Sequence, residues 1–120
     1  SAASDVYKRQ GIWYMDAMEN PNKYAGKTVN YNCIFFRPSG YSMTKFVPGR
    51  FAMTCCADDI TYLGLVCNTK NDIDLEERQW INITAEIKVE YVRDYHDMGP
   101  VLYLKDIKTG EKPEDDLVYF

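Results

Sequence analysis

The alternation of apolar and polar residues is clearest in "WINITAEIKVEYV", residues 80–92. The apolar positions of this alternation are Ile81, Ile83, Ala85, Ile87, Val89 and Tyr91. Successive side chains of a strand point to opposite faces, so a period of two predicts a strand with one buried face. We therefore predict a strand over residues 80–92, with these six residues toward the core.

Weaker patterns of the same kind occur earlier and later in the chain. Val29, Tyr31, Cys33 and Phe35 alternate with polar residues after Gly26 and predict a strand over 27–36. Further strands are predicted over 50–56, 60–67 and 101–107, and the polar run "NTKNDIDLEERQ" predicts a crossover between the third and fourth strands. The apolar stretch "IWYMDAMENP" predicts a short helix that Pro21 ends.

Five strands, a long connection after the third and a short N-terminal helix predict an all-β domain. We expect a small, closed five-stranded barrel of the OB type, because closure removes the exposed strand edges that an open sheet of this size would leave. A five-stranded sandwich is the alternative.

The length and composition are those of one folded domain. The 120 residues include 46% hydrophobic and 27% charged residues, with a net charge of -4. An acidic chain is a poor match for a duplex-binding protein, which draws its affinity from basic residues. Apolar runs stay well below the roughly 18 residues of a membrane span. We place the domain at residues 12–120 and interpret residues 1–11 as a leader, since "SAASDVYKRQ" resembles linker-derived runs in translated metagenomic reads.

Candidate chemistry is concentrated in "FAMTCCADDI", residues 51–60, where Cys55 and Cys56 precede Asp58 and Asp59. Adjacent cysteines on a regular strand point to opposite faces, so both thiols reach one ion only if the strand ends or bulges between them. Two thiolates and the Asp59 carboxylate would then suit a thiophilic ion such as zinc, with His96 or water as the fourth ligand.

Other interpretations of the same residues remain open. Cys55 and Cys56 are also typical of packing residues, Asp59 of a turn, and a redox role for the thiol pair is the third possibility. Arg50 is predicted to bind carboxylates or carbonyls near the cysteines, with recognition of an anionic ligand as its rival. Cys56 and His96 lack an orienting third group in the sequence, and we predict that the protein is not an enzyme.

Several motifs together resemble the C-terminal domain of the YcgQ-type permease subunits, a bacterial family without an assigned biochemical function. They are "NPNKYAGKTV", "GRFAMTCCADD", "YLGLVC", Trp80 and "GPVLYLKDI". The family motif maps onto Arg50, Phe51, Met53, Cys55, Cys56 and Asp59, while Asp58 departs from the small apolar residue usual there. The resemblance implies an accessory subunit that is anchored in the membrane by a segment upstream of Ser1. It also implies an integral-membrane permease as partner and an extracytoplasmic position.

The alternative function is that of a free-standing OB module for single-stranded nucleic acid or oligosaccharide. Trp80, Tyr62 and Tyr103 would supply stacking faces for such a ligand. A basic groove is not evident in a chain of this net charge, so nucleic acid is the less favoured partner.

Overall fold

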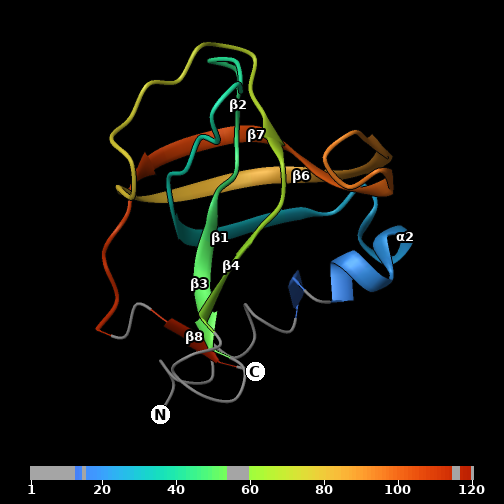
Figure 1. Ribbon diagram of the computed structural model, residues 1–120, viewed down its shortest axis with the longest axis horizontal. Helices are drawn as coiled ribbons and strands as arrows, with labels where there is room; N and C mark the ends of the chain where they lie inside the picture. The colour runs from blue at the N-terminus through green and yellow to red at the C-terminus, as the bar shows by residue number, and fades with distance from the viewer. Residues whose placement is uncertain (1–12, 15, 54–59, 115–116, 120) are drawn as a thin grey trace.

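The computed structural model describes residues 13–14, 16–53, 60–114 and 117–119 (Figure 1). One short helix and eight strands make up its named elements: α2 (Pro21–Tyr24), β1 (Thr28–Ile34), β2 (Lys45–Phe46), β3 (Gly49–Met53), β4 (Ile60–Gly64), β5 (Cys67–Asn68), β6 (Trp80–Val92), β7 (Asp97–Thr109) and β8 (Leu117–Tyr119). The prediction of a mainly-β domain is confirmed.

The strand count differs from the predicted five. The strand predicted over 80–92 coincides with β6, whereas the one predicted over 60–67 is divided into β4 and β5. The strand predicted over 101–107 is longer at both ends, because β7 pairs with β6 along almost its whole length, from Val92↔Asp97 to Ile81↔Thr109. The short strands β2 and β8 were not predicted, since two or three residues carry no measurable period.

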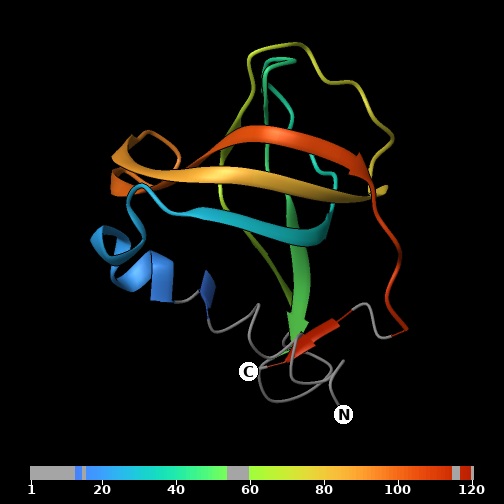
Figure 2. The ribbon, with the colours of Figure 1, turned by 180° about the vertical axis from the view of Figure 1, so that it is seen from behind.

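The strands form one strongly curled sheet. Their order is β2-β5-β7-β6-β1-β3-β4, and β8 pairs with β3 outside this path. In Figures 1 and 2, β1, β6 and β7 run across the molecule while β3 and β4 cross them steeply. β4 pairs antiparallel with β3, and β5 pairs parallel with β7. β4, at one end of the path, and β5, next to its other end, belong to a single run of chain, residues 60–68, so the path returns to the segment from which it started.

A β-bulge contributes to the curvature. Thr84 faces Asp106 and Ala85 faces Leu104, so Lys105 is the extra residue on β7. Bulges bend the strand that carries them and increase its twist. The long β6–β7 pair therefore wraps around the core instead of lying flat.

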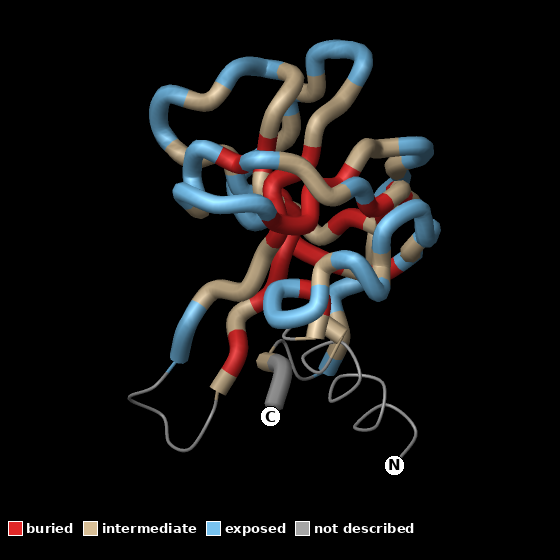
Figure 3. The backbone as a smooth tube through the Cα atoms, turned by 90° about the vertical axis from the view of Figure 1, so that its right-hand side faces the viewer, coloured by how far each residue is buried: buried red, intermediate tan, exposed pale blue. Residues whose placement is uncertain are grey.

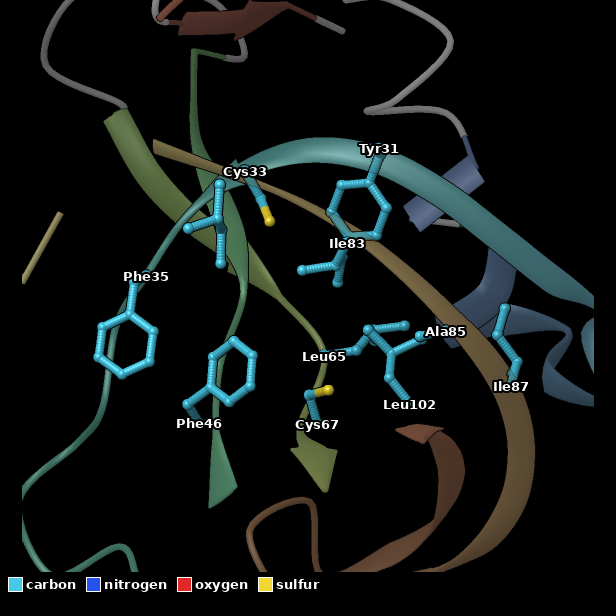
Figure 4. Close-up of a cluster of buried hydrophobic side chains, with 11 residues drawn as sticks. Tyr31, Cys33, Phe35, Phe46, Leu65, Cys67, Ile83, Ala85, Ile87 and Leu102 are labelled. Atoms are coloured by element: carbon cyan, nitrogen blue, oxygen red, sulfur yellow. The ribbon is translucent and has the colours of Figure 1, made fainter. Parts of the chain in front are cut away.

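The core lies inside this curl, as Figure 3 shows by the buried segments gathered at the centre. β6 contributes Ile81, Ile83, Ala85 and Ile87 on one face, as predicted. In Figure 4 the labelled residues of β1 and β6 share a cluster with Phe46, Leu65, Cys67 and Leu102. Burial of this large apolar surface is the main stabilising contribution to the fold.

The predicted buried face of β6 does not extend to its C-terminal end. Tyr91 is 64% exposed, whereas its neighbour Val92 is 6% exposed and packs with Val66 and Val101 in a second cluster. The β6–β7 hairpin continues past the main core at this point, so the face that is buried changes. The assignment of Tyr91 to the core was wrong for this reason.

Pro21 has two roles in the N-terminal region. It ends a helical stretch over residues 16–19, as predicted, and it also begins α2 as a residue of the first turn. A proline fits the first turn of a helix because its fixed φ suits the helix and its missing N–H would have no partner there. The short helix predicted before the first strand is thus two short helical pieces.

Candidate functional site

The predicted cysteine and aspartate ligands, Cys55, Cys56, Asp58 and Asp59, lie outside the described residues. The strands that precede and follow them in the sequence, β3 and β4, pair in register up to Met53↔Ile60. Across the described part of the chain, no group of three or more histidine, cysteine or acidic side chains could hold a metal ion.

His96, the proposed fourth ligand, is exposed and lies in the β6–β7 turn with a φ of 56°. In both ribbon views this turn lies at one side of the molecule, away from the lower ends of β3 and β4 (Figures 1 and 2). The other described cysteines, Cys33 and Cys67, are buried in the core, where burial raises the pKa of both thiols. They are therefore packing residues in the neutral thiol form.

Arg50 is the one charged side chain in the buried part of the described residues, with 4% of its surface exposed. Its guanidinium carbon lies 5.1 Å from the centre of the Trp80 ring. An aromatic face attracts a cation and offsets part of the cost of removing it from water. The structure thus brings together two residues that the sequence analysis had named for separate roles.

A cavity of about 240 Å³ lies beside this pair. Its lining consists of Ile34, Arg50, Phe51, Arg78, Trp80 and Lys112. All three charged residues in this lining are positive, although the chain as a whole has a net charge of -4.

A second cavity of about 240 Å³ lies next to the first. It is lined by Ile34, Phe36, Phe51, Tyr62, Glu77 and Arg78. Ile34, Phe51 and Arg78 line both cavities, so the two are neighbours. We call the two cavities together the Arg78 groove, with a cationic compartment at Arg50 and Lys112 and an aromatic compartment at Phe36 and Tyr62.

The pairing of the strands explains why the groove forms at this place. Ile34, the last residue of β1, pairs with Trp80 at the start of β6 and with Gly49 at the start of β3. Three strands therefore meet where β1 ends. The segment carrying Lys112 is held nearby, because the Gly110 N–H donates to the Trp80 carbonyl at 3.1 Å. Residues far apart in the sequence are brought to one surface in this way.

Arg78 joins the two compartments. Its guanidinium carbon lies 5.3 Å from the centre of the Phe51 ring, and its backbone N–H donates to the Phe35 carbonyl at 2.8 Å. Its φ of 65° lies in the left-handed region, which is unfavourable for residues other than glycine. This hydrogen bond to Phe35, the residue that follows β1, helps to maintain the conformation of Arg78.

Tyr62 orders the aromatic compartment. Its hydroxyl donates to the Val47 carbonyl at 2.6 Å, and its ring meets Phe36 and Phe51 edge to face at 5.4 and 5.3 Å. Burial, with smaller contributions from Cys33 and Glu77, raises the pKa of the Tyr62 hydroxyl well above its ordinary value. It therefore remains a neutral hydrogen-bond donor.

The sequence analysis identified part of this groove. Arg50, Tyr62 and Trp80 were named, whereas Arg78 and Lys112 were missed because each stands in a polar segment and looks like an ordinary surface charge. Tyr103 does not line either compartment; its hydroxyl donates to Glu90 at 2.5 Å. No local pattern in the sequence would have indicated that residues 50, 78 and 112 lie close together.

The strands define an all-β domain with two neighbouring surface cavities. Over residues 6–120 the chain matches the family described as the DUF1980 C-terminal domain, and it belongs to that family. The match confirms the resemblance found in the motifs, and it begins inside the segment interpreted as a leader.

A similar protein is the UPF0703 protein YcgQ of Bacillus subtilis (strain 168), which is 24% identical over 99 residues. These residues are 82% of this chain and 35% of the relative, so the chain corresponds to about a third of that protein. No solved structure matches the chain.

Among the described residues, no helix has the length and apolar character needed to cross a bilayer.

Proposed function

We propose that this chain is a non-enzymatic binding domain built on an OB-type barrel, and that it serves as the accessory domain of a membrane-anchored permease subunit. The observation that carries the proposal is the cyclic order of strand pairs. β1 pairs with β3 and β3 with β4; β5 then pairs with β7, β7 with β6 and β6 with β1. With residues 60–68 counted as one strand, this order of pairs supports a five-stranded barrel, and OB barrels are five-stranded binding modules.

One hydrogen bond between β7 and the segment that joins β4 to β5 allows closure of the barrel to be tested. The Leu102 N–H donates to the Val66 carbonyl at 2.8 Å, between β7 and the segment that joins β4 to β5. In a closed barrel this amide exchanges with solvent as slowly as the central β6 amides, because it opens only with the whole sheet. Hydrogen exchange followed by NMR measures this directly. Exchange of Leu102 at the rate of an exposed loop amide would contradict a closed barrel.

The accessory role is supported by the family and by the length of the relative. The matched part is 35% of YcgQ, so the domain works within a longer protein there. We propose that the full-length protein containing this domain is held in the membrane by its upstream part, pairs with an integral-membrane permease and exposes the domain on the outer side. Co-purification of the full-length protein with the permease encoded beside it, after detergent extraction, tests the pairing. Protease treatment of intact cells tests the side.

Each of these experiments has an outcome that would contradict the proposal. Recovery of the full-length protein in the soluble fraction would reject the membrane anchor. Recovery in the membrane without the permease would reject the pairing alone. Protection of the domain in intact cells, with digestion after lysis, would place it on the cytoplasmic side.

A second proposal concerns metal binding by Cys55, Cys56 and Asp59, which stand in the sequence between the paired residues Met53 and Ile60. Two thiolates and one carboxylate suit zinc, with water as the fourth ligand, because the turn that carries His96 lies away from the lower ends of β3 and β4 (Figures 1 and 2). Metal analysis of protein purified without oxygen should find about one zinc per chain, lost in Cys56→Ser and Asp59→Asn. Asp58→Asn is the matched control and should keep the metal. Substoichiometric zinc in every one of these proteins would reject the site.

A further inference from the structure

We propose that the aromatic compartment binds a free amino acid with an apolar side chain. Arg78 would bind its carboxylate, Glu77 would bind its ammonium group, and the aromatic rings would surround its side chain. The inference goes beyond the accessory role, because it concerns this chain alone and uses none of the proposed metal ligands. A negative result for the membrane assembly leaves it standing, and its own failure does not affect the barrel or the membrane anchor.

The two charged residues of the compartment have opposite signs. Glu77 and Arg78 both line it, and they are neighbours in the sequence. Neither belongs to an ion pair within the described part of the chain. A ligand with a net charge is attracted by one of these residues and repelled by the other, whereas a zwitterion can be attracted by both. The pair therefore favours an amino acid, which carries an ammonium group and a carboxylate on the same carbon.

Hydrogen bonds to the segment after β1 hold both charged residues in place. The Arg78 N–H donates to the Phe35 carbonyl at 2.8 Å, and Glu77 Oε1 accepts from the backbone N–H of Arg37 at 3.2 Å. Phe36 stands between these two anchor points in the sequence, so its ring and the two charges belong to one hydrogen-bonded unit. Binding groups that are held in place before the ligand arrives lose less freedom when it binds.

The Arg78 guanidinium is presented in a way that suits a carboxylate. Its carbon lies 5.3 Å from the centre of the Phe51 ring. A guanidinium over an aromatic face is held by its flat side, while its N–H donors lie in its plane and can reach two oxygens of one carboxylate. Within residues 13–14, 16–53, 60–114 and 117–119, this guanidinium makes no hydrogen bond, so its donors are available to a ligand.

The remaining walls of the compartment are mainly apolar. Phe36 and Phe51 both meet the Tyr62 ring edge to face, at 5.4 and 5.3 Å, and Ile34 also belongs to the lining. Phe36 is 36% exposed, so an apolar side chain that enters from solvent covers apolar surface. The volume of about 240 Å³ is below the roughly 300 Å³ at the lower end of typical ligand cavities, which suits a single amino acid.

An apolar side chain on a peptide is the less suitable occupant. A residue inside a peptide chain has neither an ammonium group nor a carboxylate on its backbone, and a terminal residue has only one of the two. Glu77 and Arg78 are therefore both used only by a free amino acid. The observations favour the free amino acid, and the experiment below includes a peptide.

The test follows the ring resonances of Phe36, Phe51 and Tyr62 in NMR spectra while L-phenylalanine is added to the protein. Three partial probes each lack one contact: glycine lacks the ring, N-acetyl-L-phenylalanine lacks the ammonium group, and L-phenylalaninamide lacks the carboxylate. We expect L-phenylalanine to shift these resonances and to bind about tenfold more tightly than each partial probe, since it alone makes all three contacts.

Variants assign each charge to its part of the ligand. Glu77→Gln should weaken L-phenylalanine binding about tenfold without weakening N-acetyl-L-phenylalanine, which has no ammonium group to lose. Arg78→Gln should weaken L-phenylalanine to the same extent without weakening L-phenylalaninamide. A purely structural effect of either change would weaken all probes alike. Glu76→Gln and Arg93→Gln are the matched controls: they remove the same charges from exposed positions outside the compartment and should not alter binding.

Four results would overturn the proposal. Ring resonances that do not change with L-phenylalanine would show that the compartment does not bind it. A partial probe that binds as tightly as L-phenylalanine would show that one of the three contacts is not made. Equal weakening by Glu76→Gln and Glu77→Gln would place the effect outside the compartment. A short peptide with an internal phenylalanine that binds more tightly than the free amino acid would assign the compartment to a partner protein.

Discussion

The left-handed backbone of Arg78 allows a direct test of the geometry at the centre of the groove. We compare two variants at this position, Arg78→Gly and Arg78→Ala. Both remove the guanidinium and its contact with Phe51, and both keep the backbone N–H that donates to Phe35. The stability difference between them therefore depends on how well each residue tolerates a φ of 65° and on how much conformational freedom each loses on folding.

The expected difference follows from two opposing effects. A left-handed conformation costs alanine about 1 to 2 kcal/mol and costs glycine nothing. Glycine loses more freedom on folding, at a cost of about 0.5 to 1 kcal/mol. Arg78→Gly should therefore be more stable than Arg78→Ala by about 0.5 to 1 kcal/mol, or about 2 to 4 °C in melting temperature.

Thermal unfolding followed by circular dichroism, with urea unfolding as a second measure, gives both quantities. The matched control is the same pair of substitutions at Arg93, an exposed turn residue that is not among the residues with positive φ. Alanine should be the more stable variant at Arg93. An Arg78→Ala variant as stable as Arg78→Gly would refute the left-handed conformation.

Three further predictions concern the stability of the fold. Gly49→Ala should cost about 3 kcal/mol or more, because a Cβ there would lie 2.0 Å from the backbone oxygen of Leu63; a melting temperature near that of the wild type would contradict this close approach. Arg37 donates to three backbone carbonyls at 2.6 to 3.1 Å, so Arg37→Lys should cost about 1 to 2 kcal/mol in urea unfolding, and an unchanged midpoint would show that these bonds do not stabilise the loops. Hydrogen bonds, chiefly from Lys23, lower the pKa of Asp16 to about 2 from 3.8. The stabilisation by this carboxylate is present above pH 3.8 and lost as the pH falls toward 2, so Asp16→Asn should be less stable than the wild type at pH 7 and the gap should close on acidification; a gap independent of pH would refute this linkage.

The sequence predicted the elements whose signal is local. β6 has the predicted bounds, and its residues from Ile81 to Ile87 alternate between buried and less buried positions as predicted. A strand with one buried face has apolar residues at every second position, so its burial can be predicted from its own sequence. β1 was predicted for the same reason. The family was also evident from short motifs. The cysteine pair stays a prediction, since Cys55 and Cys56 lie outside the described residues.

The tertiary structure decided how these strands combine and where a ligand surface arises. A period of two indicates which face of a strand is buried and carries no information about its neighbour, so the parallel pairing of β5 with β7 and the division of 60–68 were not predictable. The Arg78 groove depends on residues 34, 50, 78 and 112, which only the curl of the sheet brings together. An arginine or lysine in a polar segment has the same sequence signature whether it faces water or lines a cavity. The difference lies in long-range packing, which no local pattern records.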